Sequence, residues 1–67
     1  MAVQSTTVTR VGSPDAFEAL VNGLKAEMNA ILSTLAINSV LDVRYDYGQF
    51  SNPNVRVFAV GTILFLE

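Results

Sequence analysis

The chain contains no cysteine, no histidine and no tryptophan. Without cysteine there is neither a disulfide framework nor a thiolate nucleophile. Without histidine, the Ser–His and Cys–His pairs of hydrolases are excluded, together with metal sites built on His and Cys ligands. We therefore expect a protein that is not an enzyme and holds no metal ion.

Charged residues are also scarce, at 15% of the chain, and the formal net charge is −2 at pH 7. This acidic balance argues against a protein that coats nucleic acid. The longest uncharged run, residues 28–41, is too short to span a bilayer, and the first residues lack the charged and apolar regions of a signal peptide. We expect a cytoplasmic protein with neither a nucleic-acid nor a membrane partner.

What the chain does contain is apolar residues, which make up 51% of its 67 positions. That length predicts a single domain over residues 1–67. A domain of this size buries only about 60% of its unfolded surface, and small domains without disulfides or metal often gain stability by oligomerising. The composition therefore predicts a homo-oligomer.

A helix is predicted over about residues 14–35. Ser13 is a suitable N-cap, Pro14 suits the first helical position, and Asp15 places negative charge near the helix N-terminus. Large apolar residues then recur at spacings of three and four, which is typical of one buried helix face. They are Phe17, Leu20, Val21, Leu24, Met28, Ile31, Leu32 and Leu35.

A stripe of small residues runs beside that apolar face and consists of Ala16, Ala19, Gly23, Ala26 and Ala30, of which the last four are the predicted interface residues. Small side chains permit the close approach of another backbone, so the stripe predicts contact with the helix of another copy. The alternative is that alanine is simply a good helix former. Gly23 favours the contact, because glycine inside a helix costs about 1 kcal/mol relative to alanine.

Three strands are predicted, over about residues 3–11, 40–47 and 55–66. The first is rich in β-branched residues. The second alternates, which places Leu41, Val43, Tyr45 and Tyr47 on one face against the helix. Residues 48–54 form a turn-rich loop in which Phe50 either folds back on the core or contacts a ligand or neighbouring subunit. This order predicts an α+β βαββ domain, whose three-stranded, largely antiparallel sheet carries one helix across one face.

The last strand is apolar on both of its faces, although the only helix can cover just one of them. The uncovered side must then be buried by another copy, because such a patch is an association site. The residues of this predicted interface are Phe58, Val60, Leu64 and Leu66.

The charged strand residues permit two interpretations. Asp42 and Asp46 share a strand face about 13 Å apart, at ~3.3 Å per residue, which is too far for the carboxylate pair of a retaining glycosidase. If the hairpin pairs around residue 51, Arg56 lies opposite Asp46. The first interpretation is thus a cross-strand ladder of ion pairs.

The second interpretation is a ligand site shared between subunits. Arginine binds anions in a planar fork and stacks on rings. Together with aromatic residues, the arginines would suit a small anionic, aromatic ligand such as a nucleotide or flavin. The candidate residues are Arg10, Arg44, Arg56, Tyr45, Tyr47 and Phe58. We therefore expect a homo-oligomeric binding protein; the alternative is a structural or interaction protein whose surfaces serve only self-assembly or docking.

The order of elements resembles the dodecins, small proteins that form hollow shells and hold flavin between subunits. The resemblance rests on a first strand, a helix opened by Ser13-Pro14-Asp15, and two longer strands ending in an apolar tail, residues 60–66. It implies a βαββ architecture and assembly. Dodecins stack flavin on a tryptophan at the start of their second strand, where this chain has residues 37–41 and no tryptophan. No binding residue carries over, and other small βαββ families, including sporulation-type and phage-encoded proteins, share the same pattern.

Overall fold

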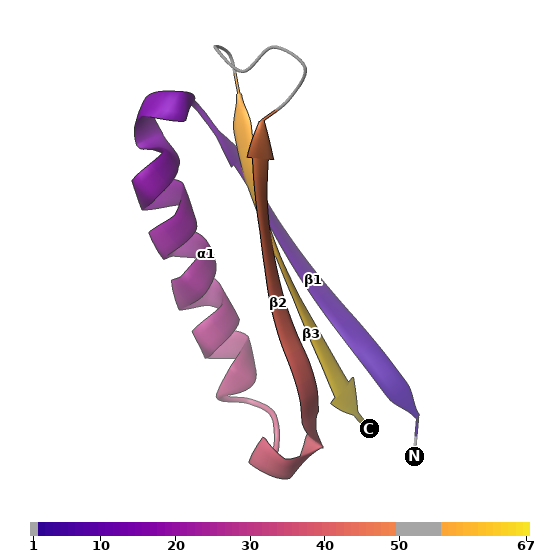
Figure 1. Ribbon diagram of the computed structural model, residues 1–67. Coiled ribbons are helices and arrows are strands. Elements are labelled where there is room, and N and C mark those ends of the chain that lie inside the picture. The colour runs from indigo at the N-terminus through magenta and orange to yellow at the C-terminus, as the bar shows by residue number, and fades with distance from the viewer. Residues whose placement is uncertain (1, 50–55) are drawn as a thin grey trace.

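The computed structural model describes residues 2–49 and 56–67 (Figure 1). The strands are β1 (Val3–Gly12), β2 (Val40–Gln49) and β3 (Val57–Leu66). The helix α1 (Phe17–Leu32) follows a short 3-10 turn, η1 (Pro14–Ala16), and a second turn, η2 (Ile37–Ser39), precedes β2. The α+β class predicted from the sequence is confirmed. The predicted loop residues Phe50 and Pro53 lie outside the described residues.

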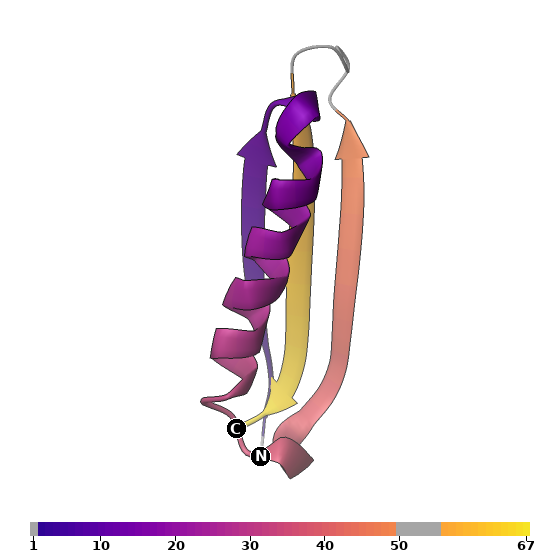
Figure 2. The same cartoon turned by 90° about the vertical axis from the view of Figure 1, so that its left-hand side faces the viewer.

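The sheet has the order β1-β3-β2, and β3 pairs antiparallel with both neighbours. The last strand of the chain is thus the central one, while β1 and β2 form the two edges. The helix α1 lies across one face of this sheet, mainly over β1 and β3, and does not cover β2 (Figure 2).

The helix ends earlier than its apolar pattern predicted, at Leu32 rather than near residue 35. The hydroxyl of Ser33 donates to the carbonyl of Ala30, and that of Thr34 to the carbonyl of Ile31, both at 2.7 Å. Both bonds are local contacts to carbonyls of the last turn, and the Ile31 carbonyl also accepts from the backbone N–H of Thr34. At the other end, Ser13 makes no side-chain capping hydrogen bond.

The core lies between α1 and β3. Leu24 and Met28 of the helix are buried against Ala59 and Ile63 of β3. At Gly61, an added Cβ would lie only 2.6 Å from the Met28 Sδ atom. Gly61 therefore leaves the space that the Met28 side chain occupies.

A β-bulge between Val40 and Asp42 changes the predicted faces of β2. Val43 and Tyr45 lie on the helix side, opposite Ile63 and Gly61. The prediction that Leu41 packs against the helix was wrong: Leu41 is 51% exposed, and Val40 packs against the core instead. The extra residue of a bulge interrupts the alternation of side chains, and the sequence pattern contains no sign of it.

Among the described residues, no helix has both the length and the apolar character needed to cross a membrane.

Candidate functional site

The sheet surface that faces away from α1 is here called the open face. On β3 its residues alternate with the buried ones and are only partly buried. No described segment lies over this surface, because α1 occupies the opposite side (Figures 1 and 2). Its members are Phe58, Val60, Thr62, Leu64 and Leu66 of β3, Val3, Ser5, Thr7, Thr9 and Val11 of β1, and Asp42, Arg44, Asp46 and Gly48 of β2.

The open face consists of three parallel rows of different chemistry. The row on β3 is apolar apart from Thr62, the row on β1 carries three hydroxyls, and the row on β2 carries three charges. The hydroxyl oxygens of Thr7 and Thr62 lie 3.4 Å apart across the β1–β3 pair. Each row thus presents a different type of contact to anything that covers the face.

The ring of Phe58 lies across Gly48 on the neighbouring strand. A Cβ added at Gly48 would lie 2.6 Å from the Phe58 Cζ atom. Gly48 therefore makes room for the largest side chain of the open face. Sequence reasoning placed Gly48 in a loop and missed this role; β2 in fact extends to Gln49.

The charged row contains one ion pair, in which Arg44 Nε donates to Asp42 Oδ2 at 2.6 Å. This hydrogen bond is the main reason that the pKa of Asp42 is lowered; desolvation opposes it, and the charge of Arg44 and a backbone hydrogen bond from Val43 lower the pKa further. Because the folded-state pKa is depressed, the pair stabilises the fold above the ordinary pKa of Asp42, and that stability is lost as pH falls through the lowered value. Solvent screening keeps the effect small.

The predicted cross-strand ion-pair ladder is wrong. Asp46 lies opposite Val60, not Arg56, and Arg44 lies opposite Thr62. The pairing of β2 with β3 is centred on residue 53 rather than 51, which shifts every partner along the strand. The Arg44 pair with Asp42 therefore runs along one strand, not between two.

Arg10 lies on the helix side of the sheet, where its Nη2 atom donates to Glu27 Oε1 at 2.9 Å. Its guanidinium passes Gly23 so closely that a Cβ there would lie 3.1 Å from Arg10 Nη1. The mid-helix glycine thus has an explanation within the subunit that the sequence did not reveal. The other residues of the small stripe, Ala19, Ala26 and Ala30, are exposed.

The six predicted ligand residues do not form one site within a subunit. Arg44 and Phe58 lie on the open face, whereas Arg10 lies on the helix side. Tyr45 and Tyr47 also lie on the helix side, each 39% exposed. Arg56 is exposed and directly precedes β3. A pocket combining these residues would have to draw them from different subunits.

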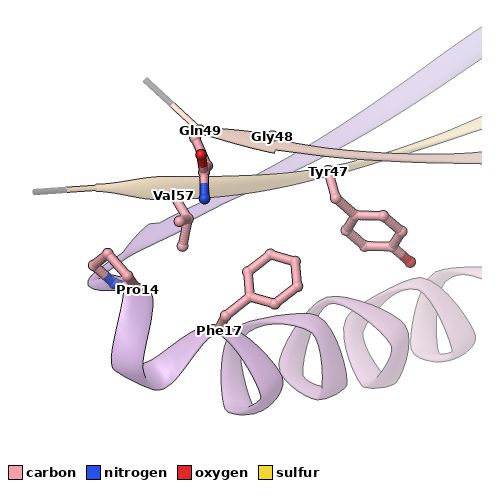
Figure 3. Close-up of a pocket in the computed structure, with 6 residues that line it drawn as sticks. All are labelled: Pro14, Phe17, Tyr47, Gly48, Gln49 and Val57. Atoms are coloured by element: carbon pink, nitrogen blue, oxygen red, sulfur yellow. The ribbon is translucent and has the colours of Figure 1, made fainter. Parts of the chain in front are cut away.

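A hollow of about 310 Å³ opens between the start of α1 and the end of β2 (Figure 3). The rings of Phe17 and Tyr47 meet there edge to face, with centroids 6.1 Å apart. The described residues around it are uncharged: Pro14, Phe17, Tyr47, Gly48, Gln49 and Val57. Sequence reasoning missed this hollow because it arises from the displacement of α1 away from β2, which helix periodicity does not encode.

A second hollow, of about 630 Å³, lies at the other end of the same side, where the end of α1 faces the start of β2. Its residues are mostly apolar: Asn29, Leu32, Ser33, Leu35, Ile37, Val40 and Val43. Both hollows border the side of β2 that α1 leaves uncovered.

No group of three His, Cys, Asp or Glu residues in the described part of the chain is placed to hold a metal ion. No family model, curated protein or solved structure matches this sequence.

Proposed function

We propose that this chain functions as a self-assembling protein whose open face is covered by a second copy. The observation that carries the proposal is the alternation on β3. Val57, Ala59 and Ile63 are buried on the helix side, whereas the apolar Phe58, Val60, Leu64 and Leu66 face away from the helix and are only partly buried. Those residues gain their full hydrophobic stabilisation only when something else covers them.

The three rows of the open face suit another copy of the same surface. A copy turned by a two-fold axis parallel to β3 brings the apolar rows together. The same rotation places the charged row of each copy, with Asp42, Arg44 and Asp46, over the hydroxyl row of the other. Hydroxyls both donate and accept hydrogen bonds, so they can satisfy arginine and aspartate alike. The face is therefore chemically complementary to itself.

The size of the face supports an association of moderate strength. Three strands of ten residues, at ~3.3 Å per residue and ~4.8 Å between strands, cover roughly 480 Å². Two such faces bury on the order of 1,000 Å², which is near the lower limit for a specific interface. A stable assembly would need a further contact elsewhere on the subunit.

Ligand binding between subunits is a second step that depends on this assembly. Among its candidate residues, Arg44 and Phe58 share the open face, whereas Arg10, Tyr45 and Tyr47 lie on the other side of the sheet. Self-assembly requires no such convergence and is the function that the geometry supports better.

The test compares Phe58→Asp and Leu64→Asp with Ile37→Asp by native mass spectrometry and light scattering. Ile37 is the matched control, because it is 88% exposed and lies outside the open face. We expect the first two variants to lose subunits relative to the wild type, and Ile37→Asp to keep the wild-type mass. Circular dichroism checks that each variant is folded.

A wild-type protein that stays monomeric at hundreds of micromolar would overturn the proposal. So would folded Phe58→Asp and Leu64→Asp proteins with the wild-type mass. Extra mass retained in simple ratio to subunits would identify a ligand in the same experiment.

A further inference from the structure

The strand β2 is an edge of the sheet, and its outer side faces away from β3. No described segment pairs with that outer side, and α1 lies over β1 and β3 instead (Figure 2). An unpaired edge presents a row of free N–H and C=O groups that another strand can pair with. The uncovered helix side of β2 also leaves Tyr45 and Tyr47 each 39% exposed.

The regular part of β2 begins after a bulge. The bulge lies between Val40 and Asp42 and interrupts one end of the strand. From Asp42 to Gln49, the pairing with β3 continues without irregularity. Tyr45 is one of the two central residues of that stretch, so a two-fold axis through it pairs every residue from Asp42 to Gly48 with a residue of the same regular stretch in the other copy.

This register also makes the charges complementary. With Tyr45 on the axis of an antiparallel pair, Arg44 lies directly opposite Asp46 of the second copy, and Asp46 lies opposite its Arg44. Directly opposed residues of an antiparallel pair are close enough to interact, and opposite charges there are favourable. The strand thus forms two identical ion pairs with itself, as a two-fold interface requires.

Two neighbouring registers also place both helices on the same face of the sheet, and their cross-strand contacts are less favourable. An axis at Arg44 sets Arg44 against itself and Asp42 against Asp46, which are like-charge contacts. An axis at Val43 sets Arg44 against Asp42 but forces Leu41, at the bulge, into the pairing. Only the Tyr45 register combines opposite charges with regular backbone.

On the helix side, the same register pairs Tyr45 with its counterpart and Val43 with Tyr47 of the second copy. Aromatic and β-branched residues are favourable cross-strand partners. The displacement of α1 toward β1 leaves room above β2 for these side chains. Both faces of the paired strands are therefore compatible with the register.

We propose that a second copy of this chain pairs antiparallel along the outer edge of β2, with Tyr45 on the two-fold axis, to form one continuous six-stranded sheet. This contact uses backbone groups and a surface distinct from the apolar row of the open face. It therefore does not depend on the open-face association, and the two together would supply the further contact that a stable assembly needs.

The first test uses charge reversal in a Phe58→Asp background, which removes the open-face association. The parent protein is expected to be a dimer. Arg44→Asp and Asp46→Arg should each be monomeric alone, because like charges then face each other. Mixed together they should form a one-to-one heterodimer, since every opposed pair again carries opposite charges. Native mass spectrometry separates these species by mass.

A monomeric Phe58→Asp parent would overturn the edge pairing while leaving the open-face proposal intact. A parent with the wild-type mass would overturn the open-face proposal instead. Reversed variants that dimerise alone, or that fail to combine when mixed, would overturn the edge register.

The second test fixes the register by crosslinking, which is clean because the chain has no cysteine. Paired strand residues lie within disulfide reach. In the same background, Tyr45→Cys should crosslink to itself on mild oxidation. Val43→Cys and Tyr47→Cys are the matched controls: each should stay uncrosslinked alone and crosslink with the other when mixed. A Tyr45→Cys dimer that does not crosslink would overturn the proposal.

Discussion

The two faces of β3 carry apolar residues in similar measure, yet α1 covers only one of them. On the covered face, Ala59 and Gly61 are small, because the helix approaches closely there and Met28 fills the space. On the open face, Phe58 and Leu64 are large and partly exposed. The comparison teaches that the covered face is fitted to a neighbour within the chain, whereas the open face leaves large apolar side chains partly exposed, which is the basis of the proposed self-assembly.

Truncating adjacent residues on the two faces should give the largest contrast. Ile63 is fully buried under α1, so Ile63→Ala should cost about 2–5 kcal/mol in the free energy of unfolding. Leu64→Ala should cost roughly 1 kcal/mol in the dissociated subunit, because Leu64 is only partly buried there. Urea titrations at low protein concentration measure both values.

The dependence of these stability losses on protein concentration distinguishes the two faces further. The loss in Ile63→Ala should be the same at every protein concentration, whereas the loss in Leu64→Ala should grow as the wild type associates. Equal, concentration-independent losses would show that the open face has no partner.

The two glycines of β2 and β3 offer a second comparison, because an added Cβ meets a side chain at 2.6 Å in both. Gly61→Ala must push against Met28, which is fully buried, so we expect a loss of about 1–3 kcal/mol in stability. Gly48→Ala meets the Phe58 ring on the open face, where the ring is only partly buried. We expect a loss below about 1 kcal/mol in the dissociated subunit, with weaker association. Urea unfolding and native mass together check both variants.

The opposite ranking, with Gly48→Ala the more damaging to the subunit, would mean that the Phe58 ring is held as rigidly as the core. The open face would then be part of the subunit's own packing rather than a surface for association.

Local sequence patterns predicted the helix and strands and their buried faces, but not the details of how the strands pair. The spacing of Leu24 and Met28 predicted the buried helix face, and the alternation of β3 predicted its two faces. The bulge beside Leu41 was not predictable, because a single extra residue leaves hydrophobic alternation ambiguous. The separation of Arg10 from Arg44 was missed for another reason. Which side of a threonine-rich strand faces the helix depends on its register with β3, not on its own sequence.

Gly23 is the residue for which sequence and structure gave different physical reasons, and it carries the smallest predicted effect. Alanine there should gain roughly 1 kcal/mol in helix propensity. The added methyl group would also displace the Arg10 guanidinium, which opposes this gain. The ion pair of Arg10 with Glu27 is partly exposed, so its loss should cost only about 0–1 kcal/mol of stability. We expect Gly23→Ala to be neutral or to stabilise the fold by less than about 1 kcal/mol, with the native mass unchanged.

Ala26→Gly, at an exposed position of the same stripe, is the matched control and should destabilise the fold by about 1 kcal/mol. A Gly23→Ala protein that is folded but has fewer subunits would contradict this expectation. It would show that the small-residue stripe contacts the helix of another copy, because one added methyl group weakens assembly only where a partner backbone lies against Gly23.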